Sequence, residues 1–210
     1  DSGIYDAMNK GAALADGEYL LYLNSGDLLI HRHVLKRVSK FLVDSTDIVY
    51  GDLIVQNQGG RLQRINYPPV LDKAFFLSSA MPHQASFIRR GFLFESGLYS
   101  LDYRIISDWA FFFHSICKKK CTYRYAGLPV SYYAAGGVSS RDENLDKMNR
   151  ETALFFEKNP DLKKEIDGGL VTGTVPFPEV LFEWVRKLRI SLTLHVYNII
   201  LNLFFIHLKK

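Results

Sequence analysis

Residues 1–27 read DSGIYDAMNKGAALADGEYLLYLNSGD, a run in which a helical pattern passes through a glycine into a short apolar stretch. Apolar side chains recur at helical spacing from Ile4 to Ala15, and Asp16-Gly17 supplies a helix-ending signal. The next segment, Tyr19–Leu23, is almost continuously apolar, as expected for a buried strand. This order of elements predicts an α/β fold.

A small polar turn with one acid, Asn24–Asp27, follows this strand immediately. In open α/β sheets, ligands bind just beyond the carboxyl ends of the strands. A carboxylate at Asp27 would be well placed there to hold a divalent cation against a phosphate. An ordinary turn stabilised by its own polar side chains would have the same sequence, so the pattern alone leaves that alternative open.

The rest of the chain continues the alternation of helical and strand patterns as far as about residue 160. Apolar residues at helical spacing predict helices over 34–43, 71–79, 90–97, 108–117 and 145–158. Strand patterns cover 47–50, 85–89, 122–133 (broken by Pro129) and a hairpin at 52–65 with its turn at 57–60. Together these elements predict a mixed sheet flanked by helices.

Composition places the chain among globular proteins. Of its 210 residues, 48% are hydrophobic and 23% are charged, with a net charge of +4. The basic residues scatter and form no long tract, which argues against a nucleic-acid-binding protein. The aromatic content of 14% is read mainly as a Phe-rich core, with sugar-stacking or membrane-contacting faces as the alternative. Cys117 and Cys121 form no disulfide framework, and we expect reduced thiols in a cytoplasmic protein.

The composition changes towards the C-terminus. Residues 161–178 are expected to form a linker, because Gly, Pro and Thr cluster from Gly168 onward. Beyond it, Ile190–Ile206 contains no Asp, Glu, Lys or Arg, and a helix there would gather its polar residues on one narrow stripe. With basic residues on both sides, 179–210 is typical of a helix lying in an anionic membrane interface. The alternative is a helix packed on the preceding domain or on a second subunit of a homo-oligomer.

A second candidate acid, Asp108, opens an aromatic-rich helix in the run RIISDWAFF at residues 104–112. Aromatic neighbours would exclude water from the carboxylate, so we expect the pKa of Asp108 to be raised. A raised pKa would suit a general base. Capping of the helix N-terminus by the same side chain would look identical in the sequence.

Four runs together resemble one enzyme family. They are DSGIYDAMNKG at residues 1–11, LNSGD at 23–27, PHQASFIR at 82–89 and RIISDWAFF at 104–112. They resemble the family 2 glycosyltransferases, the inverting nucleotide-sugar enzymes of the GT-A fold that build bacterial surface polysaccharides. The resemblance covers about residues 1–140. It implies a GT-A-like, Rossmann-related mixed sheet flanked by helices, with the C-terminal amphipathic helix as an extension. It also implies a hexosyltransferase that moves a sugar from a UDP-, dTDP- or GDP-sugar to a glycan or a lipid-linked acceptor.

The resemblance further implies roles for individual residues. Asp108 would be the base that deprotonates the acceptor hydroxyl. Asp27 would hold Mg2+ or Mn2+ against the donor diphosphate, although family members usually carry a second acid in this element and this chain has one. A structural role for His83 is the open alternative to a role in binding. The remaining implied residues are Asp1, Lys10 and Asn24 on the donor side, and His83, Gln84 and Trp109 on the acceptor side.

The family's first strands, which bind the base and ribose of the nucleotide, have no counterpart in this sequence. The resemblance therefore implies that residues 1–160 are the C-terminal part of a catalytic domain, and we expect this stretch alone to be inactive. The enzyme would be cytoplasmic and peripheral on the inner face of the cell membrane. The rival hypothesis is a non-catalytic, membrane-associated or oligomerising module on the same scaffold. The single acid of the turn at 24–27 and the predicted C-terminal helix both suggest it.

Overall fold

A computed structural model of the chain describes residues 1–43, 45–56, 60–133 and 144–167. Its strands are β1 Tyr19–Leu20, β2 Leu28–Leu29, β3 Ile48–Gln56, β4 Leu62–Ile65, β5 Ser86–Arg89 and β6 Tyr123–Tyr132. Its α-helices are α1 Ile4–Leu14, α2 Val34–Val38, α3 Lys73–Ser78, α4 Arg90–Glu95, α5 Ser107–Phe113, α6 Leu145–Lys158 and α7 Pro160–Asp167. A 3-10 turn, η1 His83–Ala85, precedes β5, and a π-helical turn, η2 His114–Lys118, follows α5.

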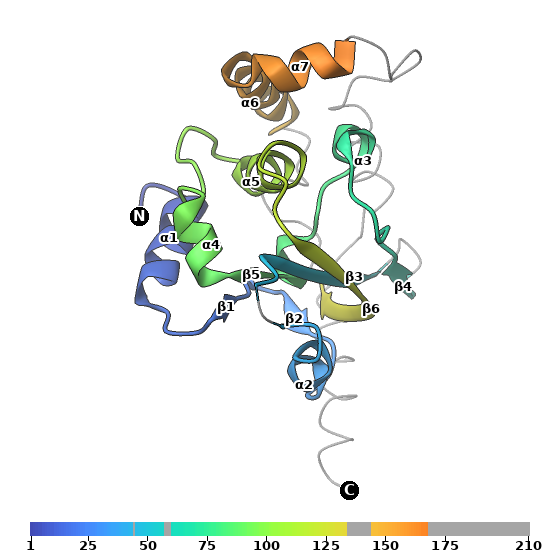
Figure 1. Ribbon diagram of the computed structural model, residues 1–210. Coiled ribbons are helices and arrows are strands. Elements are labelled where there is room, and N and C mark those ends of the chain that lie inside the picture. The colour runs from blue at the N-terminus through green and yellow to red at the C-terminus, as the bar shows by residue number, and fades with distance from the viewer. Residues whose placement is uncertain (44, 57–59, 134–143, 168–210) are drawn as a thin grey trace, which may run out of the picture.

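The strands form one mixed sheet in the order β1-β5-β3-β6-β2, with β4 paired to β3 beside this path (Figure 1). β3 runs antiparallel to β4 and β5 and parallel to β6. β1 runs antiparallel to β5, with Tyr19 opposite Arg89 and Leu20 opposite Ile88. The chain leaving β1 and the chain entering β5 therefore lie at the same end of the sheet.

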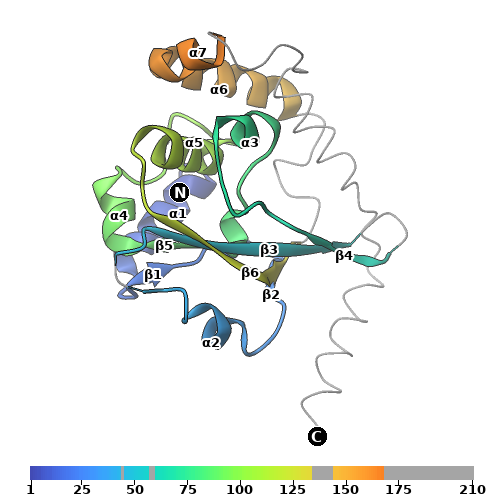
Figure 2. The same ribbon diagram turned by 45° about the vertical axis from the view of Figure 1, so that its right-hand side comes forward.

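Helices cover both faces of this sheet, as Figure 2 shows from the side. α2 lies on one face, and α3 and α5 lie on the other, with α1 and α4 beside α5 towards β1 and β5. α6 and α7 form a further layer on the outer side of α5 (Figures 1 and 2). This arrangement confirms the predicted α/β class with a mixed sheet flanked by helices.

Aromatic side chains hold α3, α5 and α6 together. Phe113 is fully buried, and its ring stacks on Phe76 at 5.2 Å and on Phe155 at 5.5 Å between ring centroids. Trp109 meets Phe155 at 4.9 Å and donates its indole N–H to the carbonyl oxygen of Phe76. Aromatic pairs in such geometries contribute about 0.5–1.5 kcal/mol each beyond the area they bury. The expectation of a Phe-rich core is thus confirmed for these residues.

Several predicted boundaries were wrong. The apolar run at 19–23 is a strand only at Tyr19–Leu20, because β5 pairs with it at just these two positions. The helix expected over 34–43 ends at Val38, where the hydrogen bonds from Phe41 to Val38 and from Leu42 to Ser39 tighten the chain into turns. The helix expected over 108–117 begins one residue earlier and becomes π-helical at 114.

The strand that was predicted to break at Pro129 runs on instead as β6. Its register against β3 shifts twice between Tyr50 and Leu53, so β6 carries extra residues opposite this part of β3. Gly127, with a φ of 64°, lies inside this bulge. A bulge leaves backbone groups unpaired, which is why a proline without an N–H group is tolerated within the strand.

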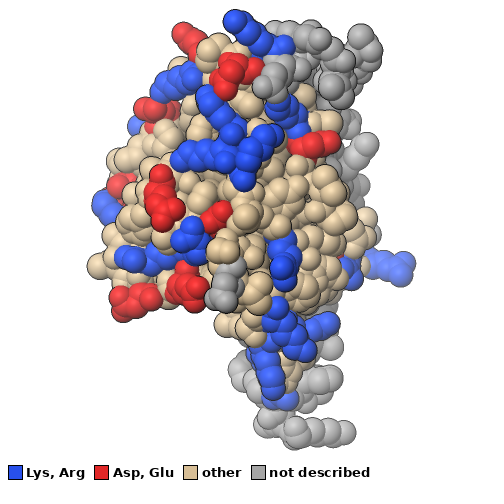
Figure 3. All heavy atoms as spheres, viewed as in Figure 1, with Lys and Arg blue, Asp and Glu red and all other residues tan. Residues whose placement is uncertain are grey.

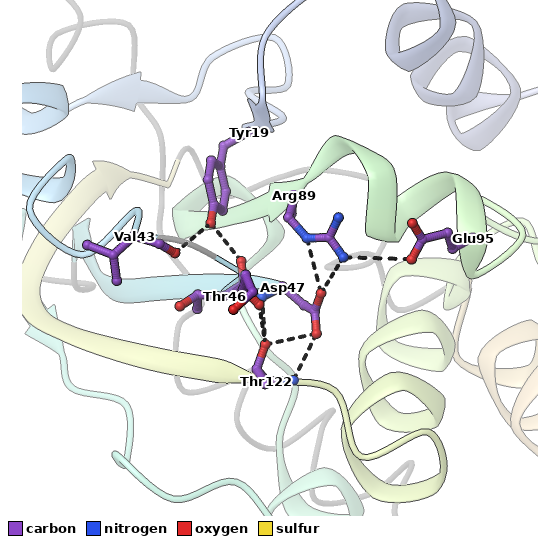
Figure 4. Close-up of polar contacts among 8 residues, drawn as sticks. Tyr19, Val43, Thr46, Asp47, Arg89, Glu95 and Thr122 are labelled. Atoms are coloured by element: carbon purple, nitrogen blue, oxygen red, sulfur yellow. Dashed lines mark hydrogen bonds and ion pairs between the residues drawn. The ribbon is translucent and has the colours of Figure 1, made fainter.

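Polar contacts at Asp47, which directly precedes β3, and at the neighbouring Thr46 join the ends of four strands (Figure 4). The carboxylate of Asp47 accepts hydrogen bonds from the guanidinium of Arg89 at 2.7 Å and from the backbone N–H and the hydroxyl of Thr122, both at 2.9 Å. Tyr19, on β1, adds a bond from its hydroxyl to the carbonyl oxygen of Thr46 at 2.7 Å. We call Tyr19, Asp47, Arg89 and Thr122 the Asp47 cluster, and the sequence analysis did not foresee it.

α7 occupies the first part of the region 161–178 that was expected to be a linker. Leu162 on this helix is buried, and Asp161 pairs with Lys118 at 3.0 Å. The remainder of that region and the predicted extension at 179–210 lie outside the described residues. Within the part of the chain that the structure does describe, no helix is both long enough and apolar enough to cross a bilayer.

Candidate functional site

The sheet brings the predicted acid turn and the predicted acceptor-side histidine together. The turn Asn24–Asp27 follows β1, and η1, which begins with His83, leads into β5. Because β1 and β5 are antiparallel, the end of one strand lies beside the start of the other. The side-chain nitrogen of Asn24 is accordingly 2.9 Å from Nε2 of His83, although the two residues are 59 positions apart.

His83 connects this turn to α5. Its Nδ1 lies 2.7 Å from Oδ2 of Asp108, in the first turn of that helix. Because the amide group of Asn24 donates to Nε2, the ring proton resides on Nδ1 and is donated to the carboxylate. The side chains of His83 and Asp108 each keep 18% of their surface exposed, so the pair is open to solvent on one side.

α1 adds a third partner to Asp108. The hydroxyl of Tyr5 lies 2.8 Å from Oδ1 of Asp108 and 2.7 Å from the carbonyl oxygen of Ile105. The backbone N–H of Trp109 donates to the same carboxylate oxygen at 2.9 Å. The sequence analysis assigned no role to Tyr5. Its position in the run DSGIYDAMNKG was the one signal that pointed to the site.

Asp108 is not the N-cap of α5. The N-cap residue is Ile106, one position before the helix, and its side chain makes no capping bond. The carboxylate of Asp108 is directed instead to His83 on η1 and Tyr5 on α1. The helix-capping interpretation of Asp108 was therefore wrong.

Burial alone would raise the pKa of Asp108, but the hydrogen bond from His83, together with the bonds from Tyr5 and from the N–H of Trp109, outweighs it. The pKa of Asp108 therefore lies below its ordinary value. The raised pKa expected from the aromatic neighbours was wrong, because these donors come from distant parts of the chain. Burial is the main cause that raises the pKa of Tyr5 well above its ordinary value, and the charge of Asp108 adds to it. The hydroxyl of Tyr5 therefore keeps its proton and stays a hydrogen-bond donor.

Asp27 lies at the other end of this series of contacts. It is 9% exposed, and its Oδ2 accepts a hydrogen bond from the backbone N–H of Asn24 at 3.2 Å. A second bond, from the N–H of Asp27 to the carbonyl oxygen of Asn24 at 2.9 Å, closes the turn. The two candidate acids are thus linked through Asn24, by its backbone N–H and its side-chain amide, and through the ring of His83. We call Asp27–Asn24–His83–Asp108 the polar chain. Among the residues that the structure describes, no three His, Cys, Asp or Glu side chains gather to hold a metal ion.

The other implied site residues have different surroundings. Asp1 and Lys10 lie on the exposed surface at α1 and pair with each other at 2.9 Å, and Lys10 also pairs with Asp6 at 2.8 Å. Gln84 and Trp109 are buried, with 5% and 2% exposure. Of these residues, the described hydrogen bonds join only the backbone of Trp109 to the polar chain. Their roles in donor and acceptor binding stay predictions.

Basic side chains gather over α2, at the lower end of the molecule in Figure 3. The segment 31–40 contains two Arg, two Lys and two His residues and no acid, and all six of these side chains are exposed. The interpretation that the basic residues scatter along the chain was therefore wrong for segment 31–40. A surface of this kind attracts anions and anionic interfaces.

No protein-family model matches the chain. Over 147 residues it is 37% identical to a PGL/p-HBAD biosynthesis glycosyltransferase of Mycobacterium bovis, a match that covers 67% of this chain and 54% of the relative. An uncharacterised glycosyltransferase of Mycobacterium tuberculosis is 32% identical over 115 residues, which are 53% of this chain and 43% of that protein. These similarities support a glycosyltransferase. The chain spans about half the length of the curated relatives it matches.

Among solved structures, that of GalNAc-T7 with UDP, GalNAc and Mn2+ is similar at a TM-score of 0.46 and 17% identity. The match covers 89% of this chain and 43% of that chain. A likeness at this level is too low to transfer either the fold or the ligands to this chain. The glycosyltransferase activity is therefore a proposal that rests on the sequence relatives, and family 2 membership, the GT-A fold and inversion are proposals as well.

Proposed function

We propose that this protein is a GT-A-type glycosyltransferase that moves a sugar, with inversion, from a nucleotide-sugar donor to a glycan or a lipid-linked acceptor. The observation that carries the proposal is the polar chain, which joins an acid turn after β1 to an acid in the first turn of α5. The similarity to glycosyltransferases over two thirds of this chain supports it.

Inversion by a single displacement needs a base that removes the proton of the acceptor hydroxyl. Asp108 is the candidate, since its carboxylate is partly exposed and is held by His83, Tyr5 and the N–H of Trp109. Its lowered pKa keeps the carboxylate ionised at neutral pH, and the same shift makes it a weak base. The site would therefore act mainly by orientation, which aligns the carboxylate with the incoming hydroxyl. General-base catalysis of this kind supplies about 10²- to 10⁴-fold in rate.

The departing nucleoside diphosphate develops negative charge, which a divalent cation would neutralise. Asp27 offers one carboxylate in the turn after β1, and the backbone N–H of Asn24 in the same turn donates a hydrogen bond to it. In proteins, Mg2+ is often bound through one or two carboxylates together with phosphate oxygens of the substrate. The residues present fit Mg2+ or Mn2+ that arrives with a UDP-, dTDP- or GDP-sugar, rather than a cation held by protein ligands alone.

The relatives that are 37% identical are named for PGL/p-HBAD biosynthesis, and this name favours a glycolipid acceptor over a soluble glycan. A lipid-linked acceptor would be met at a membrane surface. The exposed basic segment 31–40 suits an anionic surface, at about 1 kcal/mol for each Lys or Arg near the lipid. We therefore place the protein at the inner face of the cell membrane, and the predicted helix at 179–210 would be its second contact.

The first test is a pair of substitutions in the full-length protein, assayed by release of the product nucleotide from each donor sugar. We expect Asp108→Asn to lower transfer by at least about 10²-fold, because the amide cannot accept the proton. Calorimetry should find donor binding unchanged in this variant. Asp27→Ala should abolish transfer and also weaken donor binding in the presence of Mn2+.

Asp102→Asn is the matched control. Asp102 is an exposed acid that pairs with Lys158 away from the polar chain. Asp102→Asn therefore makes the same chemical change as Asp108→Asn at a position outside the proposed site. Full turnover by Asp108→Asn would remove the base from the proposal. Absence of any heat from the unmodified protein with each donor and Mn2+ would favour the non-catalytic module instead.

A further inference from the structure

Glu151, on α6, is a buried acid outside the polar chain. The residue is 7% exposed, and its carboxylate accepts hydrogen bonds from three consecutive backbone N–H groups. Oε1 accepts from Arg104 at 2.8 Å, and Oε2 accepts from Ile105 at 2.9 Å and from Ile106 at 3.2 Å. A buried carboxylate is costly unless its charge is compensated, and here peptide N–H groups compensate it.

The segment that Glu151 holds leads directly to the candidate base. Ile106 is the N-cap of α5, and Asp108 lies two residues further on. The other side of the same segment is held by Tyr5, whose hydroxyl lies 2.7 Å from the carbonyl oxygen of Ile105 and 2.8 Å from Oδ1 of Asp108. The backbone at Ile105 is thus fixed through both its N–H and its C=O group.

α6 itself is firmly docked, which makes Glu151 a rigid support. Phe155 lies one helical turn after Glu151 on the same buried face and packs on Trp109 at 4.9 Å between ring centroids. Figure 1 shows α6 alongside α5 on the side away from the sheet. α6 therefore contacts α5 at two points. Glu151 binds the backbone just before α5, and Phe155 packs against Trp109 within α5.

We propose that Glu151 is a positioning residue that sets the direction of the Asp108 carboxylate through the backbone of 104–106. This inference rests on the proposed function, in which Asp108 is the base. A glutamine at this position keeps the shape of the side chain but has one acceptor oxygen, and its NH2 group would face backbone donors. The segment would then lose at least one of its three bonds and shift.

The experiment compares Glu151→Gln with Glu157→Gln, an exposed acid on the same helix, in the full-length protein. We expect Glu151→Gln to lower kcat by about 10- to 100-fold, as misplacement of a catalytic group by about 1 Å does, and to change the KM for the donor less than twofold. Glu157→Gln should change neither constant. In hydrogen exchange, the N–H groups of 104–106 should lose protection in Glu151→Gln while those of β3 keep it.

A second comparison separates positioning from general loss of structure. If Glu151 acts through Asp108, adding Glu151→Gln to Asp108→Asn should leave the residual rate of the single Asp108→Asn variant unchanged. A further drop in the double variant would overturn the inference, and so would an unaltered kcat in folded Glu151→Gln. If Glu151→Gln does not fold, Glu151→Asp replaces it, because it keeps the charge on a shorter side chain. An unaltered kcat in Glu151→Asp would then also overturn the inference.

The two proposals fail in different ways. Loss of transfer in Asp108→Asn with full transfer in Glu151→Gln overturns the role of Glu151 alone. Full transfer in Asp108→Asn, or none in the unmodified protein, overturns the proposed function and the inference with it.

Discussion

The carboxylate of Asp108 stays ionised because its hydrogen-bond donors outweigh the effect of burial on its pKa. His83 supplies the strongest of the contributions that lower this pKa. We expect His83→Ala to raise the pKa of Asp108, since the burial remains and the donor is lost. In a plot of kcat/KM against pH, the fall on the acidic side reports the essential base of the free enzyme and should move to higher pH.

In the unmodified protein this fall should lie below the ordinary aspartate pKa of about 3.9, because a base with a lowered pKa is protonated only in stronger acid. Asp102→Asn, which changes an exposed acid away from the polar chain, is the control and should leave the profile in place. A His83→Ala profile that coincides with that of the unmodified protein would show that His83 does not tune the base.

At the scale of single elements, the Asp47 cluster stabilises the sheet where β1, β3, β5 and β6 meet. Burial would raise the pKa of Asp47, but the bonds from Arg89 and Thr122 lower it on balance. We expect Asp47→Asn to reduce the free energy of unfolding by about 2 kcal/mol, since charge-assisted bonds to both partners are lost. Urea denaturation at neutral pH measures this change.

The same cluster makes stability depend on pH. A carboxyl group whose pKa is lower in the folded state than in the unfolded state contributes stability above its unfolded pKa, about 3.9. That contribution is lost as the pH falls from there through the folded pKa. Asp47→Asn should therefore lose less stability than the unmodified protein when both are acidified over this window. Equal acid sensitivity in Asp47→Asn and the unmodified protein would contradict this expectation. Glu157→Gln, at an exposed acid on α6, serves as the control.

At the scale of the whole molecule, Phe113 joins the outer helical layer to the rest of the protein. Its ring contacts Phe76 on α3 and Phe155 on α6 and has no exposed surface. We expect Phe113→Ala to cost about 3–5 kcal/mol through the cavity it leaves. α3, α5 and α6 should still unfold in one transition, because they share the same ring cluster.

Thermal or urea unfolding, followed by both fluorescence and circular dichroism, measures the loss of stability in Phe113→Ala and shows whether the helices unfold in one transition. Phe94→Ala, at a ring that is 38% exposed on α4, is the control and should change stability by less than about 1 kcal/mol. Separate transitions from the two probes, with α6 released first, would show that the outer layer is an independent unit.

Local pattern was enough to find the elements that carry the candidate site. α6 begins and ends at the bounds that its helical spacing predicted, 145–158, and a strand lies in each of the apolar runs before Asn24 and after His83, although the first is a strand only at Tyr19–Leu20. Periodicity is a local property, so it shows in a single sequence. The early end of the helix at Val38 depends on turn bonds that no periodic pattern encodes.

Contacts between distant residues set the chemistry of the site. The polar turn with one acid, and an acid at the head of an aromatic helix, follow from the sequence, because each is a run of neighbouring residues. Tyr5 meets Asp108 across 103 positions and Glu151 meets Ile105 across 46, and only the packing of α1 and α6 on α5 creates these pairs. The direction of a pKa shift depends on which donors lie within hydrogen-bonding distance. For this reason the tertiary structure, and not the aromatic neighbours in the sequence, decides that Asp108 is an ionised and oriented carboxylate.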